Sequence, residues 1–326
     1  MLRTSADRPG FVPLNPGYNP AMPAPAAAVN PLLAFRRVAL VGRPGHPAIT
    51  EPLARLTSFL ARRGHTVVVD TDTSELLPAS KCQAAARDRL GALADVAIVV
   101  GGDGTMLSLA RELAPYDVPL IGVNLGRLGF LTDIPLAQIE GALGAILDGR
   151  YVEERRIMLD ARVSASDASE QRALALNDVA VSRGTLGGMV DMAVEIDGHF
   201  VYAMRADGLI LATPTGSTAY ALSAQGPIVH PQVPTILLVP VAPHALSNRP
   251  IAVTDSAAIT VTLLKGKDAA VHCDGQAHFP LHEGDRVLVK RAEHRVRLLH
   301  PQDHDHFAML REKLHWGETP EPLGRQ

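Results

Sequence analysis

The sequence is poor in cysteine and has no long apolar run. Its two cysteines, Cys82 and Cys273, stand far apart and match no C-x-x-C or zinc spacing. We therefore expect neither a disulfide framework nor a cysteine-held metal, and two free thiols indicate a cytoplasmic protein. The most hydrophobic stretch, residues 236–241, is too short to span a membrane and predicts a buried strand.

An excess of charge of one sign is also lacking. The net charge of −3 over 326 residues gives no footprint for nucleic acid or for an anionic membrane, so neither is an expected partner. The hydrophobic fraction of 47% is ordinary for a globular protein. Because a single core rarely grows beyond about 250–300 residues, this length predicts two domains.

The first 35 residues differ from the rest of the chain. They hold seven prolines among alanine, glycine and asparagine, and they show no apolar period. This composition predicts a disordered tail over residues 1–35, and a start codon assigned too early is the alternative. The tail lacks the hydrophobic segment of a secretory signal.

Apolar strands alternate with helical patterns over residues 36–157. We expect strands at 38–41, 66–69, 96–100 and 120–123, and helices at 49–60, 81–92, 106–114 and 136–147. Continuous apolar strands are typical of a parallel sheet that is covered on both faces. This part of the chain therefore predicts an α/β domain with an open, mostly parallel sheet.

Residues 158–297 are rich in strands and turns. Asp197-Gly198 separates two short apolar runs, which is the signal of a β-hairpin. Strand patterns follow at 253–264, 287–289 and 296–299. We expect a second, all-β domain here, followed by a C-terminal segment over 298–318 that contains an amphipathic helix at 306–316.

The sequence Gly101-Gly102-Asp103-Gly104-Thr105 lies between a predicted strand and a predicted helix. Glycines at such a turn let backbone N–H groups approach a phosphate, and a helix N-terminus favours anions. Asp103 would repel that phosphate unless it binds an accompanying Mg²⁺ or accepts the proton of an attacking hydroxyl. The alternative is a plain turn in which Asp103 caps the helix. The turn is not a Walker A loop, because no G-x-x-x-x-G-K-[ST] occurs, nor is it a dinucleotide fingerprint.

Two further segments carry polar groups next to apolar strands. Residues 207–220 run from a strand into a turn with four hydroxyls, which suits sugar or phosphate recognition, and Tyr220 could stack on a purine. A capped turn leading into a helix at 219–224 explains the same hydroxyls equally well. Asn177-Asp178 could bridge ribose hydroxyls, but by spacing alone a strand-end turn is favoured.

Three histidines near the C-terminus invite a metal-site interpretation. His300, His304 and His306 lie near Asp303 and Asp305, but their spacing is not that of a helical H-E-x-x-H site. We expect a solvated surface loop instead. The neighbours His272 and Cys273 do not make a catalytic dyad, because such pairs are adjacent in space rather than in sequence.

Taken together, these segments resemble the NAD kinases from about Arg36 to Trp316. The resemblance rests on residues 101–105, 124–132, 177–178 and 207–223, with support from 243–250 and 274–276. It implies an N-terminal α/β domain, a β-sandwich-like C-terminal domain, and a last segment, 298–318, that packs back on the first domain. It also implies transfer of the γ-phosphate of ATP to the 2′-hydroxyl of the adenosine ribose of NAD, with Mg²⁺ accompanying the donor.

The resemblance assigns roles to individual positions. Asp103 matches the aspartate that activates the acceptor hydroxyl, and Asp178 stands where the family more often has glutamate. The implied NAD-binding residues are Asp103, Gly104, Asn177, Asp178, Arg205, Asp207, Thr218, Ala219, Tyr220, Ala221, Leu222, Ser223, Ala242 and Gln276, and the phosphate-donor loop is Gly101, Gly102, Gly104 and Thr105. Relatives are commonly dimers or tetramers, so a homo-oligomer is expected.

Two other functions fit parts of the pattern. G-G-D-G alone also resembles lipid kinases of the diacylglycerol type, but we see no basic amphipathic helix that would reach a membrane acceptor. A non-catalytic dinucleotide sensor on the same scaffold is the second alternative, and retention of Asp103 speaks against it. The arginine at position 205 resembles members that are restricted to ATP rather than polyphosphate.

Overall fold

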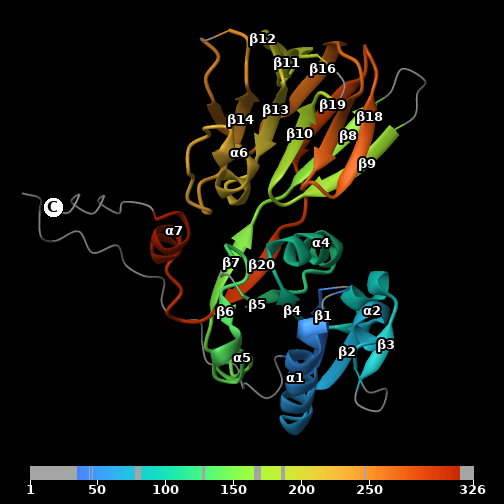
Figure 1. The fold of residues 1–326 in the computed structure, drawn as a ribbon, viewed down its shortest axis with the longest axis vertical. Coiled ribbons are helices and arrows are strands. Elements are labelled where there is room, and N and C mark those ends of the chain that lie inside the picture. The colour runs from blue at the N-terminus through green and yellow to red at the C-terminus, as the bar shows by residue number, and fades with distance from the viewer. Residues whose placement is uncertain are drawn as a thin grey trace, which may run out of the picture.

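A computed structural model describes residues 35–43, 45, 47–77, 82–126, 129–164, 170–184, 188–245 and 247–315 (Figure 1). The predicted tail lies outside these residues except for Phe35, as do Arg127 and Leu128 of the quoted motif and the chain from Trp316 onward. In the described residues no helix is both long and apolar enough to cross a membrane.

The first sheet has eight strands and is mostly parallel, as predicted. Its order is β3-β2-β1-β4-β5-β20-β7, β6 pairs with β5, and of its strand pairs only β20 with β7 is antiparallel. The strands are β1 (Arg37–Gly42), β2 (Thr66–Asp70), β3 (Gln83–Ala85), β4 (Val96–Gly101), β5 (Leu120–Asn124), β6 (Ile134–Pro135), β7 (Val152–Arg156) and β20 (Val296–His300). The four strands expected in this part of the chain are confirmed.

Helices cover both faces of this sheet because its strand side chains alternate. On β1, Val38 and Leu40 face the side that packs with α1 (Thr50–Arg62) and α5 (Ile139–Leu147). Ala39 and Val41 face the side that packs with α3 (Leu90–Leu93) and α4 (Asp103–Leu113). A short helix, α2 (Thr71–Ser74), follows β2.

The predicted helix at residues 81–92 is wrong for its described part. Gln83–Ala85 forms β3, which pairs in parallel with β2, and only a 3-10 turn and the four-residue α3 follow. The helix preference of alanine is worth less than about 1 kcal/mol per residue. Backbone hydrogen bonds along the open edge of β2 outweigh it.

The second part of the chain contains two antiparallel sheets of six strands each, which pack face to face over one core. One sheet has the order β15-β14-β13-β10-β17-β18 and the other β12-β11-β16-β19-β8-β9. The strands are β8 (Leu159–Ser164), β9 (Glu170–Ala175), β10 (Asp178–Ser182), β11 (Val190–Ile196), β12 (His199–Ala206), β13 (Gly208–Ala212), β14 (Thr235–Val241), β15 (Ile251–Thr254), β16 (Ile259–Lys265), β17 (Ala269–Cys273), β18 (Ala277–Leu281) and β19 (Arg286–Arg291).

Two details of this part were predicted and one was not. The hairpin around Asp197-Gly198 is confirmed as β11 and β12. The buried strand at 236–241 is confirmed within β14. The pattern at 253–264 is divided between β15 and β16, which lie in different sheets, because a turn closed by the Ala257 N–H and the Thr254 carbonyl interrupts it.

The chain returns to the first sheet at its end. β20 begins at Val296, before the predicted segment 298–318, and inserts between β5 and β7. Figure 1 shows β7 and β20 as the two connections between the lower α/β part and the upper β part. The amphipathic helix follows as α7 (His306–Leu314), beside the connection.

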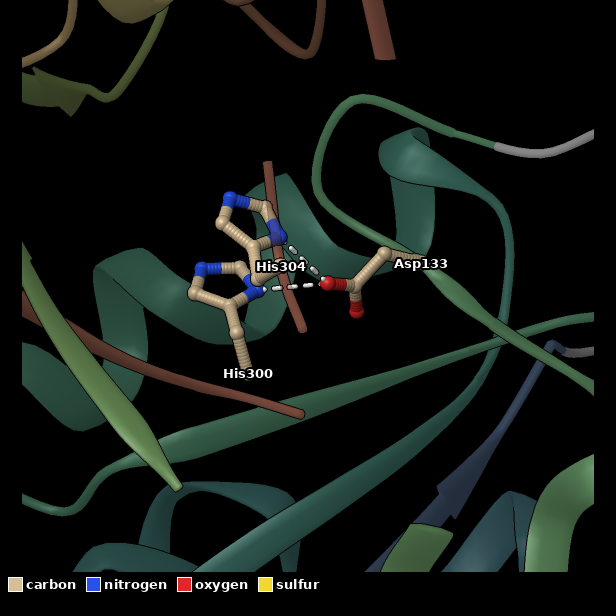
Figure 2. Close-up of side chains that lie close together, drawn as sticks. All are labelled: Asp133, His300 and His304. Atoms are coloured by element: carbon tan, nitrogen blue, oxygen red, sulfur yellow. Dashed lines mark hydrogen bonds and ion pairs between the residues drawn. The ribbon is translucent and has the colours of Figure 1, made fainter. Parts of the chain in front are cut away.

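The histidines before α7 do not form the expected solvated loop. His300 is only 1% exposed, and the side chain of His304 is 5% exposed. Both imidazoles contact the carboxylate of Asp133 (Figure 2). The two imidazoles are covered because β20 lies inside the sheet, between β5 and β7, and both rings turn toward Asp133, whereas Gln302, Asp303 and Asp305 remain exposed.

Candidate active site

The glycine-rich turn joins the end of β4 to the start of α4. Gly102 is the extended residue before the helix, and its carbonyl accepts from the N–H groups of Thr105 and Met106. A Cβ on Gly101 would lie 2.8 Å from the Thr105 hydroxyl oxygen, so a larger residue there would push the helix away. The turn therefore presents the first N–H groups of α4 at the carboxyl edge of a parallel sheet, where anions bind favourably.

The carboxylate of Asp103 is held by the segment 129–132. Its Oδ2 accepts from the Phe130 N–H at 2.8 Å, and its Oδ1 accepts from the Leu131 N–H at 3.0 Å and the Thr132 hydroxyl at 3.2 Å. A Cβ on Gly129 would lie 2.0 Å from Oδ1, so only glycine fits there. Asp103 does not cap its own helix, which excludes the plain-turn alternative for this residue.

A cavity of about 450 Å³ lies against the turn. It is lined by Gly102, Gly104 and Thr105 from the turn, and by Arg43, Arg87, Ser108 and Gln276. The guanidinium group of Arg87 donates hydrogen bonds to Ser108 Oγ at 2.9 Å and to the Glu112 carboxylate at 2.9 Å, which fix its position. Sequence reasoning missed both arginines. The signal for Arg43 was its place directly after β1, at the same sheet edge as the turn.

A second cavity, of about 430 Å³, lies in the β part of the chain. It is lined by Asn177, Asp178, Ala180, Ser182, Ala219, Tyr220, His272, Asp274 and Gly275. We call the backbone of Leu176, Asn177 and Asp178 the floor of this cavity. The carboxylate of Asp274 holds it in place, because it accepts from these three N–H groups at 2.9, 2.7 and 3.2 Å. Arg111 on α4 completes the arrangement with an ion pair of 3.0 Å to Asp274. Neither Asp274 nor Arg111 was recognised individually from the sequence.

Burial changes the acidity of this floor. Burial, and after it the charge of Asp274, raises the pKa of Asp178 to about 7. Burial also raises the pKa of Asp274, although its backbone hydrogen bonds and Arg111 oppose the shift. Burial, with the charge of Asp274, raises the pKa of the Cys273 thiol to about 12. Because the thiolate is the nucleophilic form, a thiol with so high a pKa does not act in a catalytic Cys–His dyad.

Gln276 joins the two cavities. Its Nε2 donates to the Gly104 carbonyl at 2.8 Å, and its Oε1 accepts from Arg111 at 2.5 Å. The turn between β17 and β18 is therefore fastened to the first helical turn of α4. As a result, α4 is bonded to the turn whose Asp274 also holds the backbone of Asn177 and Asp178.

The hydroxyl-rich turn at residues 213–218 packs against the backbone of this floor. Thr213 donates to the Leu176 carbonyl at 2.6 Å, and Ser217 donates to the Pro214 carbonyl at 2.6 Å. A Cβ on Gly216 would lie 2.1 Å from the Asn177 carbonyl oxygen, so the close approach requires glycine. The hydroxyls of Thr213 and Ser217 are thus used within the protein, as the capped-turn alternative predicted. Tyr220, at 45% exposure, faces the cavity.

The comparisons with known proteins agree with this geometry. Residues 38–151 match the model of the ATP-NAD kinase N-terminal domain, and residues 176–300 match that of the ATP-NAD kinase C-terminal domain. An NAD kinase of Nitrosospira multiformis is 50% identical over 286 residues, which are 88% of this chain and 97% of that protein. One from Aromatoleum aromaticum is 52% identical over 287 residues, covering 88% and 96%. The chain belongs to the NAD kinase family.

Solved structures show the same fold. Yeast NADH kinase complexed with NADH superimposes with a TM-score of 0.83 at 25% identity, covering 90% of this chain and 91% of that one. An NAD kinase from Archaeoglobus fulgidus in complex with ATP gives 0.67 at 28% identity, covering 86% and 98%. The predicted combination of an α/β sheet and a β-sandwich is therefore confirmed as the NAD kinase fold.

Some of the residues assigned by resemblance to NAD kinases do not line these two cavities. Arg205 on β12 forms an ion pair of 2.6 Å with Asp191, and it lines a separate cavity of about 430 Å³ together with Gly188. Asp207 forms an ion pair of 2.8 Å with Arg183. Ala221 is fully buried in α6 (Tyr220–Ser223). Of the run from Thr218 to Ser223, only Ala219 and Tyr220 line the cavity, and Ala242 lies just after β14.

Proposed function

We propose that the junction between the two cavities is the place where ATP and NAD meet. The activity itself follows from the family: the chain phosphorylates NAD to NADP with ATP. The single observation that carries the site assignment is the hydrogen bond from Gln276 to Gly104. It fastens the Asn177-Asp178 floor to the turn that carries Asp103, so one acceptor molecule can touch both.

NAD is proposed to occupy the floor of the second cavity with its adenosine ribose. Asn177 and Asp178 offer an amide and a carboxyl group for the ribose hydroxyls, and Tyr220 offers a ring face for the adenine. Thr218, Ala221, Leu222, Ser223 and Ala242 are proposed to complete the adenine side. The 2′-hydroxyl would then point toward Asp103, which orients it and accepts its proton as the phosphoryl group is transferred.

ATP is proposed to lay its phosphates in the first cavity. The N–H groups at the start of α4 and the guanidinium groups of Arg43 and Arg87 can neutralise the charge that develops on the transferred group. These arginines would take the place of the absent Walker lysine. Loose phosphoryl-transfer transition states depend chiefly on positioning and charge neutralisation, which this cavity supplies.

The residues also fit a Mg²⁺ ion that arrives with ATP. Asp103 uses both carboxylate oxygens for three hydrogen bonds, and a carboxylate has about four acceptor sites, so one remains. Of the residues that line the first cavity, none is acidic. A cation held mainly by phosphates and water suits Mg²⁺, with Asp103 as its protein ligand, and it would supply charge neutralisation.

We propose a homo-oligomer and a cytoplasmic location. Arg205 and Asp207 are the residues proposed to meet the nicotinamide end, but Arg205 lines a cavity that shares no residue with the other two. A second copy of the chain could bring its Arg205 to the open end of the NAD site. Dimers or tetramers would satisfy this requirement, and the cytoplasm supplies both ATP and NAD.

A panel of donors and acceptors tests these assignments. Purified protein with ATP, Mg²⁺ and NAD is expected to form NADP, whereas diacylglycerol is expected to remain unphosphorylated. The position of the new phosphate is read by NMR of the product. Binding of NAD in titration calorimetry without turnover would favour a dinucleotide sensor and overturn the role given to Asp103.

A further inference from the structure

Three buried imidazole nitrogens have no partner at the point where β20 ends and α7 begins. The Nε2 atoms of His300, His304 and His306 are buried, and none has a hydrogen-bond partner within the described part of the chain. A buried polar atom left without a partner destabilises the fold, so most such atoms are paired in native proteins. Three such atoms within seven residues of chain indicate a missing ligand rather than a packing accident.

Asp133 determines which nitrogen of each ring is available. The Nδ1 atoms of His300 and His304 lie 2.7 and 2.9 Å from the same oxygen, Asp133 Oδ2 (Figure 2). A carboxylate can only accept here, so both Nδ1 atoms carry a proton and donate it. When the rings are neutral, the Nε2 atoms, which Figure 2 shows pointing away from Asp133, hold free lone pairs. Metal-binding histidines in proteins commonly have this carboxylate support on the opposite nitrogen.

The carboxylate of Glu154 on β7 lies near the Nε2 atoms of His300 and His304, at distances at or beyond the upper limit for a hydrogen bond. Its Oε2 lies 3.5 Å from His300 Nε2, and its Oε1 lies 4.0 Å from His304 Nε2. Two ligands of one tetrahedral zinc ion, each about 2.0–2.1 Å from the metal, are separated by about 3.4 Å. The gaps at Glu154 are therefore close to the ligand separations of a metal site.

The two carboxylates beside these histidines favour a bound positive charge. Asp133 and Glu154 are both buried, and their side chains are 9% exposed. Arg156 forms an ion pair with Glu154 and can neutralise one of the two negative charges. The second needs a further positive group, because an uncompensated buried charge is strongly unfavourable. A protonated His300 between the two carboxylates could supply it. A bound dication would supply it as well, and it would also occupy the lone pairs of both neutral histidines.

We propose that His300, His304 and Glu154 bind one divalent ion of the zinc class, with Asp133 orienting the two imidazoles. His306, whose Nε2 is the third unpartnered nitrogen, packs edge-on against His230 and is not counted among these ligands. Imidazole and carboxylate donors without a thiolate suit zinc and its first-row neighbours. A cavity of about 870 Å³ that is lined by Asp133 and His304 lies beside the site.

The ion would connect the end of the chain to the segment that holds Asp103. Glu154 lies on β7, His300 ends β20, and His304 precedes α7, so one ion joins three elements. Asp133 directly follows residues 129–132, whose N–H and hydroxyl groups bind the Asp103 carboxylate. The site is thus a structural clamp that holds this segment and α7 on the first sheet.

Zinc titration of the whole chain tests the site without reference to turnover. Protein carrying no polyhistidine tag is stripped with a chelator and titrated with ZnCl₂ in the absence of nucleotide. Bound metal is measured by mass spectrometry and the unfolding midpoint by calorimetry. We expect one zinc per chain and a midpoint that rises with free zinc. Cobalt in place of zinc should give the visible absorption of a four-coordinate site.

Matched variants identify the ligands. His304→Ala and Glu154→Gln should each weaken zinc affinity at least about a hundredfold, and Asp133→Asn by about 10–100-fold. His294→Ala removes an exposed histidine from the turn before β20 and should change nothing. Asp103→Asn should also retain zinc, because the ion does not bind at the catalytic carboxylate.

Two results would overturn the proposal. One is a stripped wild-type chain that retains no zinc at micromolar free metal, in which case a protonated His300 between the two carboxylates balances the charge. The other is unchanged zinc affinity in both His304→Ala and Glu154→Gln. If the alanine variant fails to fold, Glu154→Gln and Asp133→Asn, which preserve side-chain size, still decide the question.

Discussion

The side-chain amide of Gln276 donates a 2.8 Å hydrogen bond to the backbone carbonyl of Gly104. The two residues are 172 positions apart in sequence, and they belong to the β part and the α/β part of the chain respectively. The bond connects the turn that holds Asp103 to the floor that holds Asn177 and Asp178.

Replacing Gln276 by alanine should impair catalysis more than folding. The change removes the bond to Gly104 and leaves Arg111 without one of its acceptors. We expect kcat/KM for NAD to fall about tenfold, which corresponds to about 1.4 kcal/mol. The unfolding midpoint should change little, because the side chain is largely exposed. Gln232→Ala, at an exposed glutamine elsewhere, is the control, and an equal loss in both variants would contradict the role given to Gln276.

Asp103→Asn should abolish most turnover while NAD affinity stays within a few-fold of the wild type. The amide cannot accept the hydroxyl proton, and one of its atoms becomes a donor facing the N–H groups of the segment 129–132. A loss of about 10²–10⁴-fold in kcat is expected for a group that handles the proton. Thr132→Val removes the 3.2 Å hydroxyl contact to Asp103 and the 3.1 Å bond from Asn124, but it keeps both N–H donors to Asp103 and should cost much less. NADP formation by steady-state assay distinguishes the two, and near-normal turnover of Asp103→Asn would remove the aspartate from the reaction.

Arg43→Ala should weaken the use of ATP and leave that of NAD unchanged. The arginine lines the cavity against the glycine-rich turn and is absent from the cavity at Asn177 and Asp178. We expect KM for ATP to rise about tenfold, since a charge-assisted contact to phosphate contributes more than about 1 kcal/mol. Arg89→Ala, at an exposed arginine, should have wild-type kinetics. Parallel increases in both KM values would show that Arg43 supports the fold rather than the donor.

Asp178→Asn should stabilise the protein at high pH. The folded-state pKa of about 7 lies above the ordinary value of 3.8, so the folded protein favours the protonated form. Stability from this group is present at low pH and is lost as pH rises through 7. The variant should therefore melt at least about 4 °C above the wild type at pH 8, and the difference should shrink toward pH 5. Asp72→Asn, at an exposed position, is the control in melting curves from pH 5 to 8, and a constant difference would contradict the raised pKa.

Gly216→Ala should destabilise the fold and weaken NAD binding together. A Cβ at this position would lie 2.1 Å from the Asn177 carbonyl oxygen, so the turn must move away from the floor. We expect a loss of about 1–3 kcal/mol in the free energy of unfolding, measured by urea titration. Gly141→Ala adds the same methyl group to α5 with no atom within 4 Å, and it should be neutral or slightly stabilising. Equal stabilities of the two variants would show that the turn adapts without cost.

Local sequence signals determined much of the fold. Apolar runs specified β1, β2, β4 and β5 because buried parallel strands need apolar side chains on both faces. They failed at residues 83–85, where alanine favoured a helix but the open edge of β2 offered backbone hydrogen bonds. They failed again at His300, because burial of a polar residue depends on where the chain returns and not on its neighbours in sequence.

Some residues of the candidate site could be recognised from the sequence, and others only from the structure. The sequence by itself indicated the turn at Asp103, where Gly101 and Gly129 permit close contacts, and it singled out Asn177, Asp178 and Tyr220. Only the tertiary structure decided that Asp274, Arg111 and Gln276 join these parts, that Arg43 and Arg87 line the cavity beside the glycine-rich turn, and that Asp133 contacts both His300 and His304. The physical reason is that ion pairs and hydrogen bonds across 100 or more residues depend on how the sheets are placed, and local sequence patterns carry no record of that placement.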